Sequence, residues 1–316
     1  MPEVEGYLEG FALRVPSDIS GLLVVDKPKG PTSFDVVARV RRLTGAAKAG
    51  HTGTLDPLAT GVLVVLLGEA VKLQQFLSAG DKAYEALVAF GAATTTQDAE
   101  GEVVARADPS KLEEGLVRKA LSGFTGHLEQ TPPMFSAIRV KGRRLHEAAR
   151  AGEEVERPSR RVWVEELRLL EMTPPVQGLV HARIEVRCGK GTYVRTLMAD
   201  LGARLGLPAH LAALRRLAAG PFTLSEALSL ERAEELAQAP PGIGGRILPL
   251  AEALRGFPMV RLSTAQARDL GHGKCLELEG TRPGLCGALD PDGQLRAVCE
   301  VNGGRVRPLR VLHASR

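Results

Sequence analysis

The sequence predicts an α+β fold with a mixed or antiparallel central sheet, followed by a small β-rich domain. Short apolar and alternating runs typical of strands recur along the first part of the chain, among a few segments with helical spacing. The Pro- and Gly-rich stretch 239–245 has the composition of a linker. Beyond it, short apolar runs are broken by Gly and Pro. We therefore expect one domain over residues 1–245 and a second over 246–316.

The composition is that of an ordinary globular protein. Of the 316 residues, 44% are hydrophobic and 25% are charged, which suffices for a large and a small domain. The four cysteines form no C-x-x-C pair and have no His cluster beside them, which argues against a zinc site or a disulfide framework. The N-terminus is acidic and polar, unlike a signal peptide. The sequence has no run of ~18 or more apolar residues, the length that a membrane span requires. We therefore expect a cytoplasmic protein.

The first elements have clear boundaries in the sequence. The apolar run 21–26 predicts a buried strand, and 27–31 must be a turn. Thr32 offers an N-cap for a helix, and Gly45 ends that helix. The apolar side chains of the helix follow at helical spacing, at Phe34, Val37, Val40 and Leu43.

A Gly- and Thr-rich loop is predicted next, over 46–60, before two strands. The β-branched run 62–67 is typical of a central strand, and the alternation over 84–90 predicts another. Ser110 and Glu113 form a capping-box pattern, which predicts a helix from there to about residue 121.

The later elements are predicted by alternation and by flanking glycines. The runs 162–170 and 181–188 read as strands. A helix is predicted over 192–205, between Gly191 and Gly206. Three short strands are expected in the second domain, at 260–262, 284–289 and 295–301.

The basic character of the chain is local. The whole sequence carries a formal charge of +4, and the stretch from Arg139 to Arg161 alone, with eight Lys or Arg against four Glu, carries as much. Such a stretch is either a solvated charged helix or a surface that contacts nucleic acid.

The loop from Gly50 to Gly61 is the segment most suggestive of chemistry. Its three glycines and one proline impose an unusual backbone path, with one carboxylate, Asp56, directly before Pro57. A residue before proline is held in extended geometry. Asp56 is either part of an ordinary Asp-Pro turn or a catalytic carboxylate.

The same loop resembles the signature of the bacterial TruB-type tRNA pseudouridine synthases. GHTGTLDPLATGVL matches it almost residue for residue, and further segments resemble the other motifs of this family in order and spacing over residues 21–220. These segments are 21–33, 81–84, 91–101, 133–142, 188–197 and 214–217. The tail resembles the PUA domain of the family, a small RNA-binding β-barrel. The resemblance implies a pseudouridine synthase catalytic fold followed by a PUA-like domain.

The resemblance also implies an activity and a catalytic trio. The family isomerises uridine in RNA to pseudouridine: the base is detached from C1′, rotated and rejoined through C5, without a cofactor. Asp56 would be the nucleophile or its electrostatic equivalent, and Arg195 the cation that keeps it ionised. Tyr84 would stack on the flipped base and take part in proton transfer at C5.

RNA-binding residues are carried over in the same way. His51 is expected to contact the nucleotide, Lys27 to reach phosphate, and Asp98 to organise the neighbourhood through hydrogen bonds. A basic insert over about 127–160 is expected to contact RNA. Its candidate residues are Arg139, Lys141, Arg143 and Arg144.

The resemblance implies that the substrate is uridine 55 in the T loop, so the expected partner is the T-arm of tRNA. It also implies a monomer with no obligate protein partner. A secondary role in tRNA folding is expected as well. Three alternatives stay open: an RNA chaperone without catalysis, a guide-RNA-dependent synthase subunit, and a structural ribosome-associated factor. The last leaves the loop around Asp56 unexplained.

Overall fold

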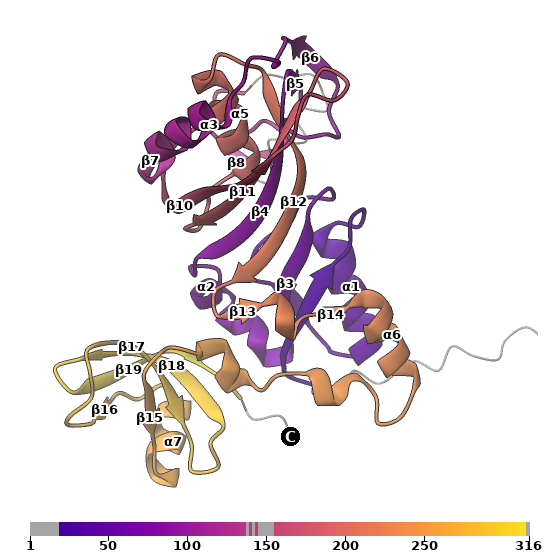
Figure 1. Cartoon of the computed structure of the whole chain (residues 1–316). Helices are drawn as coiled ribbons and strands as arrows, with labels where there is room; N and C mark the ends of the chain where they lie inside the picture. Colours follow the sequence, from indigo (N-terminus) through magenta and orange to yellow (C-terminus); the bar gives the residue numbers. More distant parts are fainter. Residues whose placement is uncertain (1–18, 137–138, 141–142, 145–154, 314–316) are drawn as a thin grey trace, which may run out of the picture.

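A computed structural model describes residues 19–136, 139–140, 143–144 and 155–313 of the chain. Two β-sheets account for most of the strands, and helices pack on both faces of the larger one (Figure 1). The predicted α+β class is confirmed. Within the described ranges, no helix combines the length and the apolar character needed to cross a membrane.

The larger sheet is mixed, as predicted. Its β1–β14 and β3–β12 pairs are parallel, and its other pairs are antiparallel. The strands lie in the order β14 (Leu228–Ser229), β1 (Gly21–Lys27), β3 (Thr60–Leu67), β12 (Ala209–Ala219), β4 (Lys82–Phe90), β11 (Val180–Cys188), β10 (Arg160–Met172) and β7 (Gly126–Gln130), with β13 (Phe222–Thr223) on β12 and β2 (Ala49–His51) on β3.

Helices and short 3-10 turns cover both faces of this sheet. They are α1 (Ser33–Thr44), η1 (Gly68–Leu73), α2 (Gln74–Leu77), α3 (Glu114–Leu121), η2 (Ser122–Phe124), α5 (Val194–Arg204), η3 (Leu224–Glu226), α6 (Leu230–Gln238), η4 (Ile243–Arg246) and η5 (Leu250–Leu254). The small hairpins are β5 (Ala92–Thr94) with β6 (Val103–Arg106), and β8 (Arg139–Val140) with β9 (Arg143–Arg144). The helices α3 and α5 share one core with β4, β10, β11 and β12.

The side chains of β1 alternate between two further cores. Leu23 and Val25 face the side that α1 and α6 cover. Leu22 and Val24 face the opposite side, where η1 and η5 pack. This period of two is the strand alternation expected for a sheet buried on both faces. Both faces of β1 are therefore buried in packed cores.

The first helix begins and ends as predicted. Thr32 caps α1 in a reciprocal arrangement with Asp35, and Gly45 ends the helix in the left-handed conformation at φ 72°. The predicted capping box at Ser110 is wrong. Its hydroxyl donates to the Asp108 carboxylate at 2.8 Å instead, and α3 begins only at Glu114. An aspartate two residues upstream competes successfully for the hydroxyl.

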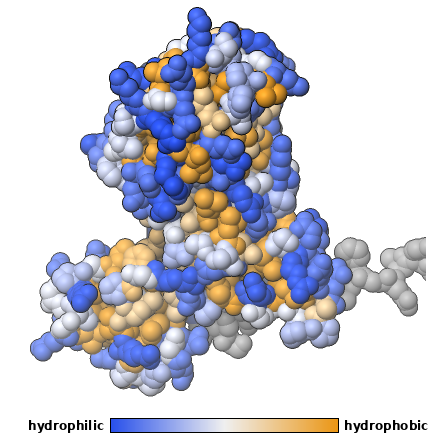
Figure 2. Space-filling model, in the orientation of Figure 1, coloured by the Kyte–Doolittle hydropathy of each residue, from blue (hydrophilic) through white to orange (hydrophobic). Residues whose placement is uncertain are grey.

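The smaller sheet contains β15 (Met259–Arg261), β17 (Gly284–Leu289), β18 (Leu295–Asn302), β19 (Arg305–Val311) and β16 (Leu276–Glu277), in that order, with α7 (Thr264–Gly271) packed on it. Leu295, Val298 and Leu312 share a core with β1 and β3 of the larger sheet. Figure 2 shows hydrophobic residues over this sheet and hydrophilic ones over much of the end that carries α3 and β7.

The boundary at residue 245 stays a prediction. The stretch 239–245 is not free of the fold, because Ile243 is buried in the core beneath α1 and α6. Main-chain hydrogen bonds of 2.9 and 2.8 Å also join Leu22 to Leu248. Contacts between the two parts of the chain therefore continue across this boundary.

Candidate active site

The start of α1 and the turn before it hold the main chain on both sides of Asp56. The Ser33 hydroxyl, at the start of α1, donates to the Leu55 carbonyl at 2.9 Å and accepts the Leu55 N–H at 2.7 Å. On the other side of Asp56, the Gly30 N–H donates to the Pro57 carbonyl at 2.9 Å. The main chain beside the carboxylate is therefore fixed before any substrate binds.

Lys27 also holds this loop through hydrogen bonds to its carbonyls. Its ammonium donates to the carbonyls of Pro28 at 2.9 Å, Pro57 at 3.3 Å and Ala59 at 2.7 Å. The residue has no exposed surface, so the expectation that it reaches phosphate is wrong. Burial lowers the pKa of Lys27 to about 8, although Asp56 acts in the opposite direction. Its role is to order the loop.

Asp56 forms an ion pair with Arg195. The distance between Arg195 Nε and Asp56 Oδ2 is 2.9 Å. Arg195 lies in the first turn of α5, and its other nitrogens are also held: Nη1 donates to the Thr96 carbonyl and to Asp98 Oδ2 at 2.9 and 3.2 Å, and Nη2 to the Phe135 carbonyl at 2.9 Å. The guanidinium therefore bridges two carboxylates.

The two carboxylates differ in exposure. The Asp98 side chain is 4% exposed and the Asp56 side chain 39%, so only Asp56 is open to a ligand. Asp98 was expected to organise the neighbourhood of the site through hydrogen bonds, and its buried carboxylate accepts one from Arg195. It also accepts the Thr96 hydroxyl and the Glu100 N–H.

The charges around Asp56 act in opposite directions on its pKa. Burial raises the pKa of Asp56 above its ordinary value, Arg195 and Lys27 lower it, and Asp98 raises it. The walls of the site desolvate the carboxyl, while its open face points into a cavity. Arg195 is therefore the main group that favours the ionised form.

Asp56, Tyr84 and Arg195 come together in one cavity of about 160 Å³. The rest of its lining is Thr54, Leu55, Ser136, Thr192, Tyr193, Val194 and Leu214. Cavities for drug-sized ligands measure ~300–1,000 Å³, so this one suits a single flat ring. Tyr84 comes from β4 and is buried, and burial raises its pKa. The predicted trio is thus assembled from three separate parts of the chain.

His51 lies apart from that cavity. It ends β2 opposite Val65 of β3 and does not line the pocket around Asp56. Burial, with a smaller effect of Arg216, lowers the pKa of His51, which favours the neutral ring. Its Nδ1 is buried, and no group in the described part of the chain hydrogen-bonds to it. The predicted nucleotide contact of His51 stays a prediction.

The basic insert begins beside the site. Phe135 already contacts Arg195 through its carbonyl. Beyond it, β8 and β9 form a short hairpin in which Arg139 pairs with Arg144, and Arg143 lies on its second strand. Lys141 lies outside the described residues. The RNA contacts expected of this insert stay a prediction.

Arg216 was not among the residues predicted for the site. This residue is buried in β12 and donates to main-chain carbonyls of the loop before Asp56. The only signal was its place in the segment 214–217, which resembles a core motif of the family. A buried arginine cannot be distinguished from a partly exposed neighbour such as Arg215 without the strand register.

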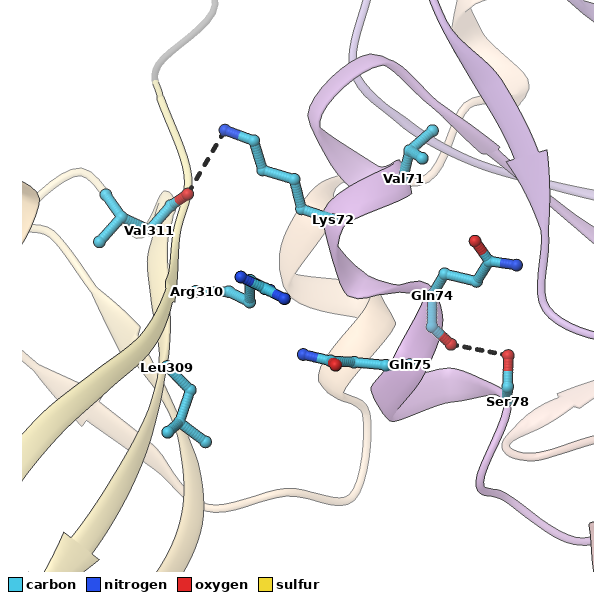
Figure 3. Close-up of a pocket in the computed structure, with 8 residues that line it drawn as sticks. All are labelled: Val71, Lys72, Gln74, Gln75, Ser78, Leu309, Arg310 and Val311. Carbon is cyan, nitrogen blue, oxygen red and sulfur yellow. Dashed lines mark hydrogen bonds between the residues drawn. The ribbon is translucent and has the colours of Figure 1, made fainter.

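Two larger cavities lack the chemistry of this site. One of about 620 Å³ lies between η1–α2 and β19, where Gln75 and Arg310 face each other (Figure 3). None of the described residues that line it is acidic. The other, about 660 Å³, lies in the C-terminal part around His272 and Asp290, and Asp290 is engaged by Arg296 at 2.7 Å. The cavity at Asp56 therefore stays the candidate active site. Among the residues described, no three His, Cys, Asp or Glu side chains are grouped to hold a metal.

Family profiles match almost the whole of this structure. Residues 41–194 match the TruB family pseudouridylate synthase N-terminal domain. Residues 195–255 match the tRNA pseudouridylate synthase B C-terminal domain, and 257–313 match the C-terminal part of tRNA pseudouridine synthase II. The first profile contains Asp56, and the second begins at Arg195.

Relatives and solved structures agree with these profiles. The tRNA pseudouridine synthase B of Thermobifida fusca is 43% identical over 93% of this chain and 99% of its own length. That of Symbiobacterium thermophilum is 50% identical over 81% of this chain and 83% of its own length. A chain in the crystal structure of a Cbf5-Nop10-Gar1 complex is 25% identical, with a TM-score of 0.70 over 93% of this chain and 85% of that one.

Proposed function

The chain belongs to the TruB family of pseudouridylate synthases, and we propose that the uridine it isomerises is position 55 in the T loop of tRNA. The enzyme is an isomerase. The N1–C1′ bond of the uridine breaks, the base rotates, and a C5–C1′ bond forms. C5 then loses a proton and N1 gains one, so that atoms and electrons balance without an oxidant or a cofactor.

The observation that carries the proposed reaction is the Asp56–Arg195 pair at the open cavity. A carboxylate has to be ionised to act as nucleophile or to stabilise positive charge, and the buried arginine favours that form. Asp56 could attack C6 of the base, attack C1′ of the sugar, or stabilise a glycal-forming elimination. All three paths use the same carboxylate in the same place.

Tyr84 is proposed to receive the flipped base. Its ring lines the cavity beside Asp56, where an aromatic face can stack on a uracil. Burial raises the pKa of Tyr84, so the phenol is protonated at neutral pH. Its hydroxyl group is proposed to take part in proton transfer at C5. His51 is proposed to support nucleotide binding from the base of the loop.

Extraction of the uridine costs a few kcal/mol of lost stacking and pairing. We propose that the basic insert and a PUA-like domain over 246–316 supply this energy through phosphate contacts, which do not depend on base sequence. Disruption of the tRNA elbow during extraction would also give the enzyme a secondary role in tRNA folding. The proposed setting is the cytoplasm, and the proposed form is a monomer.

A stand-alone enzyme is favoured over a guide-RNA-dependent subunit. Relatives that are 43% and 50% identical over most of this chain carry the name tRNA pseudouridine synthase B, whereas the Cbf5 complex is 25% identical. Purified enzyme with unmodified tRNA transcript and nothing else should therefore form product.

The experiment that tests the proposal maps the product on two transcripts. Pseudouridine is detected by its carbodiimide adduct in an unmodified tRNA and in a matched transcript with cytidine at position 55. We expect one adduct, at position 55, in the first transcript alone. Product at another uridine would refute the assignment of position 55. Tight binding without product on either transcript would support the chaperone alternative.

A further inference from the structure

Arg216 occupies a central position beneath the catalytic loop. It lies on β12, between β3 and β4 (Figure 1), in register with Gly61 on one side and with Tyr84 on the other. Its side chain is among the largest that are fully buried, with 1% of the residue exposed. A permanently charged group in such a place has to have its donors satisfied.

Three of the partners of Arg216 are main-chain carbonyls. Nε donates to Val62 at 2.6 Å, Nη2 to Gly53 at 3.0 Å and Nη1 to Thr54 at 3.3 Å. In the described part of the chain, no carboxylate forms an ion pair or hydrogen bond with it. Buried carbonyls need hydrogen-bond donors. The Arg216 guanidinium supplies a donor to three of them, two before Asp56 in the chain and one after it.

The main chain of Arg216 is pinned as well. A Cβ on Gly61 would lie 2.2 Å from the Arg216 carbonyl oxygen and 2.7 Å from its nitrogen. The close approach of β3 to β12 therefore requires glycine at this position. As a result, neither the main chain nor the guanidinium of Arg216 can move unless a strand of the central sheet moves with it.

Arg216 also lies beside the second reactive group. Tyr84 is its register partner on β4, and the positive charge of Arg216 opposes the effect of burial on the Tyr84 pKa. Leu214, two residues earlier on β12, lines the same cavity. One strand thus contacts both the loop before Asp56 and the strand that carries Tyr84.

We infer that Arg216 is a positioning residue that fixes the catalytic loop relative to Tyr84, so that Asp56 and the aromatic ring face one substrate base. The inference rests on the proposed function. A guanidinium is required, because a lysine ammonium at the same place cannot direct three donors along a planar fork. The reaction step should therefore depend on Arg216 more strongly than RNA binding does.

The test compares Arg216→Lys and Arg216→Met with the same two changes at Arg215. Arg215 is the natural control, since its side chain is 42% exposed and pairs with Asp26 at 2.7 Å on the other face of the strand. The single-turnover rate constant is measured at saturating enzyme. The dissociation constant for tRNA is measured in an Asp56→Asn background, in which turnover is not expected. Thermal unfolding is followed for every variant.

We expect the rate constant to fall about 100-fold in Arg216→Met and about 10-fold in Arg216→Lys, with tRNA affinity changed by no more than about twofold. Both Arg215 variants should stay within about twofold of wild type. If Arg216→Met does not fold, Arg216→Lys decides, at a temperature at which it is fully folded.

A wild-type rate constant in folded Arg216→Lys would overturn the inference and leave the proposed function intact. A loss of rate matched by an equal loss of tRNA affinity would overturn it too, because Arg216 would then act through binding. Absence of product from the wild-type enzyme would overturn the proposed function and this inference together.

Discussion

At the scale of single residues, the site is a row of three alternating charges, of which only the Asp56 carboxylate is open to a ligand. Asp98 is buried against Arg195, and Arg195 in turn holds Asp56 at the cavity. The partners lie far apart in sequence, 97 residues in the case of Asp98 and Arg195. Buried carboxylates keep their charge only beside a cation, so the ionisation of Asp56 depends on Arg195.

Substitution of Arg195 should therefore change the pH dependence of the reaction. In Arg195→Gln, burial still raises the pKa of Asp56 but its main opposing cation is gone, so the pKa rises further. Activity needs the ionised carboxylate and is lost as the pH falls through that pKa. We expect the acidic limb of the single-turnover pH profile to move to higher pH, with a rate about 100-fold lower near neutrality. An acidic limb at its wild-type position would contradict this.

Lys27 should make stability depend on pH in the alkaline range. Its pKa is about 8 in the folded protein against an ordinary value of 10.5. Between these values the unfolded chain binds more protons, so the free energy of unfolding rises with pH, by up to about 3 kcal/mol. Lys27→Met should lack this rise in urea unfolding at about pH 7.5 and pH 9.5. The same rise in both proteins would show that other groups cause it.

At the scale of elements, the ends of α1 and five strands of the large sheet, β1, β3, β4, β10 and β11, could be predicted from local pattern. The central strand β12 could not. Its sequence, AHLAALRRLAA, is rich in Ala, Leu and Arg, which favour helix, and its two register shifts break the alternation. Its place between β3 and β4 overrides that preference. The burial of Lys27 and Arg216 depends on this strand order, which no local pattern reveals.

The contact between β3 and β12 can be tested through Gly61. This glycine has φ +102°, and a Cβ would overlap the main chain of Arg216. We expect Gly61→Ala to lower the free energy of unfolding by more than about 2 kcal/mol. Gly115→Ala, in the helix α3 with open space around it, is the control and should stabilise by about 0.5–1 kcal/mol. Equal stability of Gly61→Ala and wild type would contradict the close approach.

At the scale of the whole molecule, a small cavity for one base has to act on a large folded RNA. The cavity itself offers little surface, so affinity has to come from outside it. The stretch from Arg139 to Arg161 holds an excess of positive charge equal to that of the whole chain. We propose that most of the salt-dependent binding comes from this stretch.

Charge reversal in this stretch should reduce both affinity and its salt dependence. For Arg143→Glu with Arg144→Glu, we expect weaker tRNA binding and a slope of log affinity against log salt that is smaller by about one per lost phosphate contact. Arg118→Glu with Arg232→Glu, on the exposed faces of α3 and α6, is the matched control. Unchanged affinity and slope in the first variant would remove the insert from the RNA interface.

Whether Asp56 carries out the isomerisation can be measured with Asp56→Asn in a single-turnover assay on unmodified tRNA transcript. Asp292→Asn, an exposed carboxylate in the C-terminal part, is the control. We expect no pseudouridine above background from Asp56→Asn, tRNA affinity within about threefold of wild type, and a wild-type rate from the control. Product from Asp56→Asn at a rate within about tenfold of wild type would contradict this expectation.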